Sequence, residues 1–242
     1  MEVGIVIAAA GAGTRLARGS KALVEIGGAT LVAHAVRRFS AMSEIGPIVV
    51  VAPAADEARV GAAVQTAAGG RAVVVCAGGS TRQESVRAGL AALAPCEIVL
   101  VHDAARPLAS ESLVRRVIAA ALEVGAVLPG VTPRDAVRRV SEGRSGRRLD
   151  QSLDRGELVL AQTPQGFRRE LLERAHEAAR EQGLAADDDA QLVAAIGHPV
   201  AIVEGESTNV KVTVPEDLPL VEHLLRALLD PADASPRMVL NQ

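Results

Sequence analysis

Residues 3–16 read VGIVIAAAGAGTRL, a strand-length apolar run followed by a loop that contains two glycines. The run at residues 3–9 lacks polar alternation, which is typical of a strand buried on both faces of a parallel sheet. A glycine-rich loop directly after such a strand offers backbone N–H groups that can cradle phosphates. This segment therefore predicts an α/β fold whose ligand site lies just beyond the first strand.

Apolar runs continue to alternate with helical stretches as far as residue 131. Further strands are expected at residues 47–52, 72–76, 97–101 and 125–131, and helices at 30–39, 56–66, 83–93 and 110–123. Continuous β-branched runs separated by helices imply a parallel sheet covered on both faces. We therefore expect a doubly wound, mostly parallel Rossmann-like sheet that binds its ligands at the carboxyl ends of the strands.

The segment at residues 132–154 differs from its surroundings because it is rich in arginine and has few core positions. Two interpretations stay open: a projecting β-arm, a hairpin around residues 141–146 that packs on a partner subunit, or a disordered loop. Beyond it, we expect helices at 168–182, after Asp188 and at 215–229, and strands at 199–203 and 209–213. These assignments predict one domain over residues 1–229, with the arm at about 132–157 and a C-terminal tail over 230–242.

Composition excludes several classes of protein. The chain has 242 residues, a net charge of −3 and a pI near 6.0, which argues against a nucleic-acid binder held by a basic surface. Its apolar runs are too short to span a membrane, so no membrane partner is expected. Cys76 and Cys96 lack metal-ligand spacing, and no basic stretch precedes the first strand, so we expect a reduced, cytoplasmic protein.

The first glycine-rich loop does not match the two common nucleotide motifs. A dinucleotide fingerprint would place its third glycine where Leu16 stands, and no acidic residue ends the second strand, which disfavours a nicotinamide dehydrogenase. A P-loop would need Gly-Lys-Ser/Thr, but Ser20 precedes Lys21 and Ala22 follows it. What remains is a phosphate-cradling loop with two cations, Arg15 and Lys21; the alternative is a tight turn with surface charges.

Lysine usage singles out two positions. The chain contains 24 arginines but only two lysines, Lys21 and Lys211. Because arginine serves almost everywhere that a surface cation is needed, a remaining lysine suggests a requirement for a compact ammonium group. Chance survival of two lysines is the alternative.

Acidic residues mark two further candidate positions. Asp103 follows an apolar strand and is well placed to hold Mg²⁺ near bound phosphates, although it could instead fix its loop by pairing with Arg106. The run at residues 187–189 consists of three aspartates. It could form a second metal cluster, but carboxylates at the N-terminus of a helix are the favoured interpretation.

Five segments together resemble a known family. They read AAGAGTRL at residues 9–16, AGGSTRQES at 77–85, LVHDAARP at 100–107, QTPQGF at 162–167 and NVKVT at 209–213. The first is similar to the signature loop of nucleotidyltransferases that activate phosphorylated sugars and polyols. The set resembles the 2-C-methyl-D-erythritol 4-phosphate cytidylyltransferases of the non-mevalonate isoprenoid pathway, from residue 3 to about residue 229.

The resemblance implies a function and a role for each matching residue. It implies transfer of CMP from CTP to 2-C-methyl-D-erythritol 4-phosphate, with release of pyrophosphate, by a homodimer that exchanges its arms. The CTP phosphates would contact Ala10, Gly11, Ala12 and Gly13, and the cytosine would contact Gly79 and Ser85. Arg15 and Lys21 would stabilise the transition state, and Asp103 would hold Mg²⁺. The acceptor would be bound and positioned by Arg106, Arg155, Thr163 and Lys211, with Arg155 able to serve the neighbouring subunit.

The chain departs from the family pattern at four positions, which are Ser20 in place of Pro, Ser80 in place of Asp, and Ala136 and Asp187 in place of Thr. Two alternatives to the implied function stay open. A cytidylyltransferase for another polyol phosphate, such as ribitol 5-phosphate, would share nearly every motif. A non-catalytic nucleotide-binding module would keep the first loop but tolerate loss of Lys21 and Asp103.

The chain has two phenylalanines and no tryptophan or tyrosine, so we expect it to recognise cytosine without aromatic stacking.

Overall fold

The computed structural model describes residues 2–11, 20–143 and 146–229. Within these residues, an eight-stranded sheet has the order β10-β7-β11-β6-β1-β4-β5, and β12 also pairs with β7. The strands are β1 Val3–Ala8, β4 Ile45–Ala52, β5 Val73–Ala77, β6 Ile98–Asp103, β7 Ala126–Val131, β10 Leu160–Ala161, β11 Gln165–Arg168 and β12 Ala201–Glu204. The pairs β1–β4, β1–β6, β4–β5 and β7–β12 are parallel, which confirms the expected doubly wound, mostly parallel sheet.

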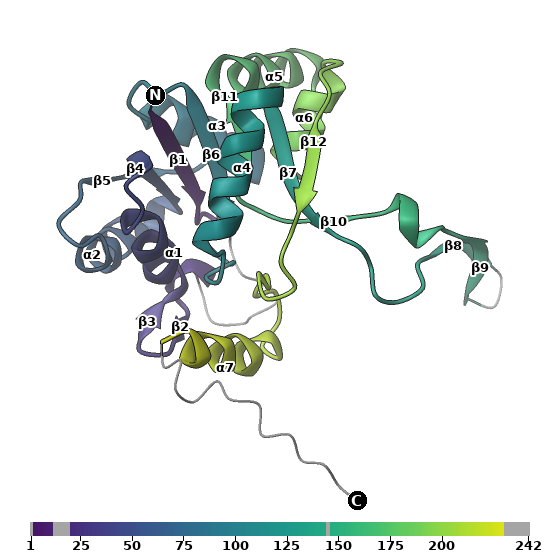
Figure 1. The fold of residues 1–242 in the computed structure, drawn as a ribbon, viewed down its shortest axis with the longest axis horizontal. Helices are drawn as coiled ribbons and strands as arrows, with labels where there is room; N and C mark the ends of the chain where they lie inside the picture. The colour runs from purple at the N-terminus through teal and green to yellow at the C-terminus, as the bar shows by residue number, and fades with distance from the viewer. Residues whose placement is uncertain (1, 12–19, 144–145, 230–242) are drawn as a thin grey trace, which may run out of the picture.

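Side chains of β1 alternate between two hydrophobic clusters, one on each face of the sheet. Helices lie on both sides of the sheet (Figure 1): α1 Leu31–Ser40, α2 Glu57–Ala67, α3 Arg82–Ala92, α4 Glu111–Val124, α5 Arg169–Gln182 and α6 Asp189–Ala195. Ile5 and Ile7 belong to the cluster under α1, α2 and α4, whereas Val6 belongs to the cluster under α3, α5 and α6. Thr30 caps α1 as expected, because its Oγ1 accepts a hydrogen bond from the N–H of Ala33.

The register of the central strands brings two chemical segments to one edge of the sheet. In the parallel pair β1–β6, Ala8 lies opposite Asp103, and both strands end there. The loop that begins at Ala9 therefore leaves the sheet beside the Asp103 carboxylate. This edge is formed by the carboxyl ends of parallel strands, where α/β sheets bind ligands.

Two expectations about strands need correction. The segment Gln165–Arg168 forms β11, which runs antiparallel between β6 and β7 and buries Phe167 completely. From the sequence, no strand is expected at this segment, because four residues interrupted by Gly166 show no strand periodicity. Conversely, residues 209–213 form no strand. Val212 instead donates its N–H to the carbonyl of Ala105, so this backbone group is hydrogen-bonded without strand pairing. Its side chain packs in a small cluster with α7 (Asp217–Leu229).

That small cluster also fixes the position of the Lys21 segment. It joins Val24 and Ile26 to Val212 and to Val221 of α7. Lys21 begins the short helix η2 (Lys21–Leu23), which ends directly before Val24. Lys211 directly precedes Val212. The two lysines are therefore carried by segments that pack into one apolar cluster, although they lie far apart in the sequence.

The arginine-rich segment forms a hairpin, the first of the two interpretations that the sequence leaves open. Strands β8 (Arg138–Gly143) and β9 (Gly146–Ser152) pair antiparallel with each other, and in Figure 1 they project away from the main sheet. Leu149 exposes 65% of its surface, and Val140 exposes 41%. Among the described residues, no helix is long and apolar enough to span a bilayer.

Candidate functional site

Two cavities open side by side at the carboxyl ends of β1 and β6. The first has a volume of about 380 Å³ and the second about 290 Å³. Three charged residues line both of them: Arg82, Asp103 and Lys211. Two binding spaces that share one charged wall suit a reaction in which two anionic reactants must meet.

Asp103 lies between two cations at this shared wall. Its Oδ2 is 2.6 Å from Nζ of Lys211, and its Oδ1 accepts a hydrogen bond from Nε of Arg82 at 3.1 Å. Burial alone would raise the pKa of the Asp103 carboxyl, but the charges of Arg82 and Lys211 outweigh it and hold the pKa well below its usual range. Asp103 is therefore an anion at every pH at which the protein would be assayed.

The backbone of Asp103 is held by Thr163, and the Thr163 hydroxyl in turn contacts His102. Its N–H donates to Oγ1 of Thr163 at 3.0 Å, and the Thr163 hydroxyl lies 3.1 Å from Nδ1 of His102. The carbonyl oxygen of Arg106, 3.0 Å from Nε2 of His102, can only accept, so the ring proton lies on Nε2, and Nδ1 of the neutral ring accepts from the Thr163 hydroxyl. Burial lowers the pKa of His102 to about 4, so its imidazole is neutral near pH 7.

Besides Asp103 and Lys211, the first cavity collects five of the residues singled out in the sequence: Ala10, Gly11, Lys21, Gly79 and Ser85. At one end, the loop after β1 presents its backbone. At the other end, the turn before α3 is held by a capping box, in which Oγ1 of Thr81 accepts from the N–H of Glu84 and the Glu84 carboxylate accepts from the N–H of Thr81. The hydroxyl of Ser80 also donates to Glu84, at 2.6 Å.

Close packing explains the glycines in that turn. A Cβ on Gly78 would lie 2.6 Å from Oγ of Ser85 and 2.7 Å from Cβ of Ala10, and a Cβ on Gly79 would lie 2.4 Å from Cβ of Glu84. The turn can therefore approach the first loop this closely only without a side chain at position 78, and it can close against Glu84 only without one at position 79.

The second cavity contains the remaining predicted acceptor residues that lie in the main body, Arg106 and Thr163. The Arg106 guanidinium donates to the carbonyl oxygens of Asn209 and Ala161, at 2.8 and 3.2 Å. Its orientation is thus fixed by the backbone rather than by a carboxylate, and the alternative pairing of Asp103 with Arg106 is wrong. Asp103 pairs with Arg82 and Lys211 instead.

Of the predicted site residues, three lie outside the part of the chain that the structure describes, and one lies apart from the two cavities. Ala12, Gly13 and Arg15 lie outside the described residues. Arg155 begins the short helix η4 (Arg155–Glu157) at the base of the arm, where its Nη1 donates to the carbonyl oxygen of Arg134 at 2.5 Å. Within one chain, Arg155 lines neither cavity.

Sequence reasoning missed Arg82 and assigned Asp189 incompletely. Arg82 is one of 24 arginines, so its residue type does not single it out as a site residue. Its position could have done so, because it directly follows the N-cap of a helix that comes after two glycines. The expected helix N-terminus is confirmed for Asp188, whose Oδ1 accepts from the N–H of Gln191. Asp189, however, is buried and pairs with Arg82 and His176. No group of three or more His, Cys, Asp or Glu side chains forms a metal site within the residues that the structure describes.

Comparison with known proteins gives a consistent result. Residues 3–227 match the family model described as 2-C-methyl-D-erythritol 4-phosphate cytidylyltransferase. A protein of that name from Thermus thermophilus is 44% identical over 226 residues, which cover 93% of this chain and 98% of that protein. One from Solibacter usitatus is 38% identical, covering 93% and 96%.

Solved structures agree with the sequence matches. The crystal structure of the cytidylyltransferase from Thermus thermophilus superposes with a TM-score of 0.76 at 38% identity, covering 93% of this chain and 100% of that one. The 4-diphosphocytidyl-2C-methyl-D-erythritol synthase from Anaerococcus prevotii superposes with a TM-score of 0.81 at 28% identity, covering 93% and 96%.

Proposed function

Because the chain belongs to the 2-C-methyl-D-erythritol 4-phosphate cytidylyltransferase family, we propose that its paired cavities transfer CMP from CTP to 2-C-methyl-D-erythritol 4-phosphate. The products are 4-diphosphocytidyl-2-C-methyl-D-erythritol and pyrophosphate. The observation that carries this proposal is the shared wall of Arg82, Asp103 and Lys211 between the two cavities. We assign residues 1–229 to one nucleotidyltransferase domain, with the arm at about 132–157 and residues 230–242 as a tail.

CTP occupies the first cavity in this proposal. Its phosphates bind the backbone of Ala10 and Gly11 beside Lys21, which all line this cavity. By the family resemblance, Ala12 and Gly13 extend the phosphate contact and Arg15 is a second cation. Its cytosine lies against Gly79 and Ser85, where the glycine turn leaves room for a small base. Both phenylalanines, Phe39 and Phe167, are buried in the core, which supports a base pocket that works by size and hydrogen bonds rather than by stacking.

The methylerythritol phosphate occupies the second cavity, with Arg106, Thr163 and Lys211 around it. Its phosphate is already an oxyanion, so the reaction needs no catalytic base. An acceptor phosphate oxygen attacks the α-phosphorus of CTP, a new P–O bond forms, and the bond from the α-phosphorus to the bridging oxygen breaks. Pyrophosphate leaves with that electron pair. The main barrier is repulsion between anions, which Lys21, Lys211 and Arg106 offset.

Mg²⁺ fits the chemistry of this wall, with Asp103 as its protein ligand. The carboxylate is held in its anionic form and lines both cavities, and nucleotide sites commonly hold Mg²⁺ through one or two carboxylates plus substrate phosphates. A single aspartate is therefore a sufficient protein contribution. When bound, the ion would neutralise charge on the triphosphate as pyrophosphate departs.

A homodimer gives Arg155 a role, because within one chain it lies apart from the cavities. The hairpin β8–β9 exposes Val140 and Leu149, as expected of a surface that packs on a partner. A mixture of Arg155→Ala and Lys21→Met proteins tests this arrangement. If Arg155 serves the neighbouring site, mixed dimers regain one intact site and about a quarter of wild-type activity returns. No recovery would show that Arg155 does not act across subunits.

We also infer a cytoplasmic location, which the free thiols of Cys76 and Cys96 support.

The acceptor is tested by comparing initial rates of pyrophosphate release with CTP and either methylerythritol phosphate or ribitol 5-phosphate. Higher kcat/KM with methylerythritol phosphate is expected, whereas preference for ribitol 5-phosphate would reassign the enzyme to another polyol phosphate. Comparable rates with ATP or GTP would contradict the small-base pocket.

A further inference from the structure

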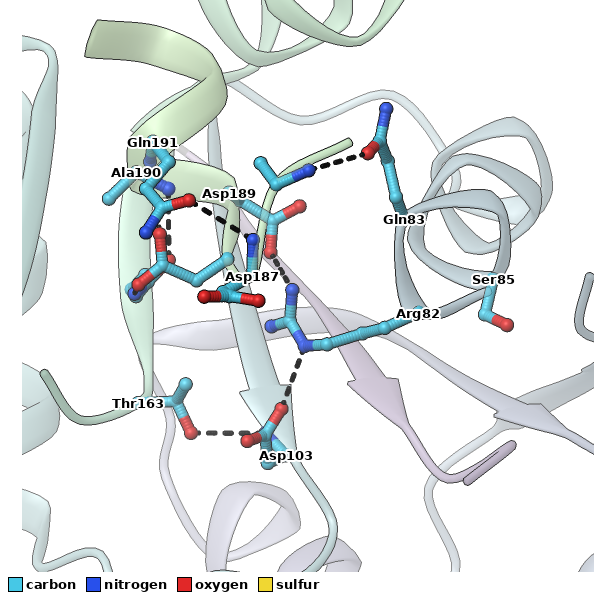
Figure 2. Close-up of polar contacts among 12 residues, drawn as sticks. Arg82, Gln83, Ser85, Asp103, Thr163, Asp187, Asp189, Ala190 and Gln191 are labelled. Carbon is cyan, nitrogen blue, oxygen red and sulfur yellow. Dashed lines mark hydrogen bonds and ion pairs between the residues drawn. The ribbon is translucent and has the colours of Figure 1, made fainter. Parts of the chain in front are cut away.

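Arg82 lies between two carboxylates that come from different parts of the fold. Its Nε donates to Oδ1 of Asp103 at 3.1 Å, and its Nη1 donates to Oδ2 of Asp189 at 2.7 Å. Figure 2 shows the guanidinium pointing between the end of β6, which carries Asp103, and the start of α6, which carries Asp189. The arginine thereby connects the reaction site to the helical layer behind it.

The far end of this connection is buried and hydrogen-bonded. Asp189 exposes 1% of its side chain and His176 exposes 3%, and Nε2 of His176 lies 2.9 Å from Oδ1 of Asp189. Burial would raise the pKa of the Asp189 carboxyl, but Arg82 and His176 hold it below its usual range. Asp189 is therefore a fixed, buried anion that anchors Arg82 on the side away from the cavities.

The near end faces the chemistry. Arg82 lines both cavities, and it holds one oxygen of Asp103 while Lys211 holds the other. The Lys211 side chain is 39% exposed, whereas that of Arg82 is 26% exposed and anchored at two nitrogens. Lys211 is thus the cation that can turn toward a substrate phosphate, and Arg82 is the cation that stays.

This difference matters because a buried carboxylate that loses its partner is strongly unfavourable. We propose that Arg82, anchored by Asp189, is a positioning residue for cytidylyl transfer. It keeps Asp103 compensated and correctly oriented at the junction of the cavities while Lys211 engages phosphate. The inference rests on the proposed function, and it adds a residue that acts through Asp103 rather than on the substrate.

A purely structural role is the competing explanation, since Arg82 also links α3 to α6. Arg169 offers a matched control for that role. Its guanidinium donates to the carbonyls of Leu90, Leu93 and Ala94 and to the Glu173 carboxylate. Arg169 lines neither of the two cavities. Replacing it with lysine disturbs packing without touching Asp103.

The experiment measures kcat, both KM values and thermal unfolding for wild type, Arg82→Lys, Asp189→Asn, the double variant and Arg169→Lys. We expect Arg82→Lys and Asp189→Asn each to lower kcat at least about tenfold with KM for CTP changed less than about threefold. In the Arg82→Lys background, Asp189→Asn should cost less than about a further threefold, because both act through one contact. Arg169→Lys should lower the unfolding temperature while kcat stays within about twofold.

Several outcomes would overturn the proposal. A wild-type kcat in Arg82→Lys would do so. So would a loss of kcat in Arg169→Lys as large as that in Arg82→Lys, if the two variants lose the same amount of stability. If Arg82→Lys does not fold, Asp189→Asn alone decides, because it keeps the size and a hydrogen-bond acceptor at position 189. Wild-type turnover in the same assay separates the two claims: its absence overturns the proposed function and the role of Arg82 together, whereas turnover with unaffected variants overturns only the latter.

Discussion

Nζ of Lys211 lies 2.6 Å from Oδ2 of Asp103, so a cation from a late loop meets the carboxylate that ends the central strand β6. Replacing Lys211 by Met should lower kcat at least about 100-fold, because it removes a charge that offsets repulsion between the two reactants. Lys211→Arg should lower kcat at least about tenfold, since a planar fork that pairs with Asp103 through two nitrogens is less free to reach phosphate. Steady-state pyrophosphate release measures both, and wild-type turnover in Lys211→Met would refute this role.

Lys21 tests the significance of lysine usage directly. It lines the first cavity from η2, in a chain whose basic side chains are arginine at 24 of 26 positions. Lys21→Arg keeps the charge but replaces a compact ammonium by a larger planar group, and we expect kcat/KM for CTP to fall at least about tenfold. Intact turnover in Lys21→Arg would mean that its survival as lysine is accidental. The unfolding temperature of the variant serves as the control for folding.

Gly78 and Gly61 form a matched pair of glycine positions. A Cβ on Gly78 would collide with Ser85 and Ala10 in the first cavity, whereas a Cβ on Gly61, within α2, meets nothing within 4 Å. Gly78→Ala should therefore raise KM for CTP at least about tenfold. Gly61→Ala should stabilise the protein by roughly 0.5–1 kcal/mol with unchanged kinetics, because alanine favours the helix. Equal kinetics in the two variants would show that the turn does not shape the nucleotide pocket.

His102 gives stability a defined dependence on pH. Its pKa is lowered from 6.5 to about 4 by burial, so between these values the unfolded chain binds more protons than the folded one. Stability should therefore fall as pH decreases from about 6.5 toward 4, with a loss of about 2 kcal/mol from this group by pH 5. Urea unfolding at pH 7.5 and pH 5.0 measures the loss, and His102→Gln should show a smaller one. An identical pH dependence in the variant would assign the effect to other groups.

Sequence patterns predicted what depends on local chemistry. The apolar run before Gly11 identified the central strand, and the segment around Asp103 identified the end of a neighbouring one, so their meeting at one edge followed from parallel topology. Residues 209–213 alternate like a strand, yet Asn209 donates to the carbonyl oxygen of Thr163 and Val212 to that of Ala105. Those partners lie far away in the chain, and local periodicity contains no information about them.

The role of Arg82 was hidden for a related reason. Its partners, Asp103 and Asp189, are separated from it by 21 and 107 residues. Taken alone, Asp103 was interpreted as a metal ligand and Asp189 as part of a helix N-terminus. Only the packing of α6 against the end of the sheet brings the two carboxylates to one guanidinium.

Product analysis by ³¹P nuclear magnetic resonance is the most direct test of the central claim, that Arg82, Asp103 and Lys211 join two substrate sites for cytidylyl transfer. The protein is mixed with CTP, 2-C-methyl-D-erythritol 4-phosphate and Mg²⁺, with Lys211→Met in parallel. The wild type should form equal amounts of pyrophosphate and of a new diphosphate diester, and Lys211→Met should form both at least about 100-fold more slowly. Intact CTP after prolonged incubation of folded wild-type protein, or equal rates for the two proteins, would contradict it.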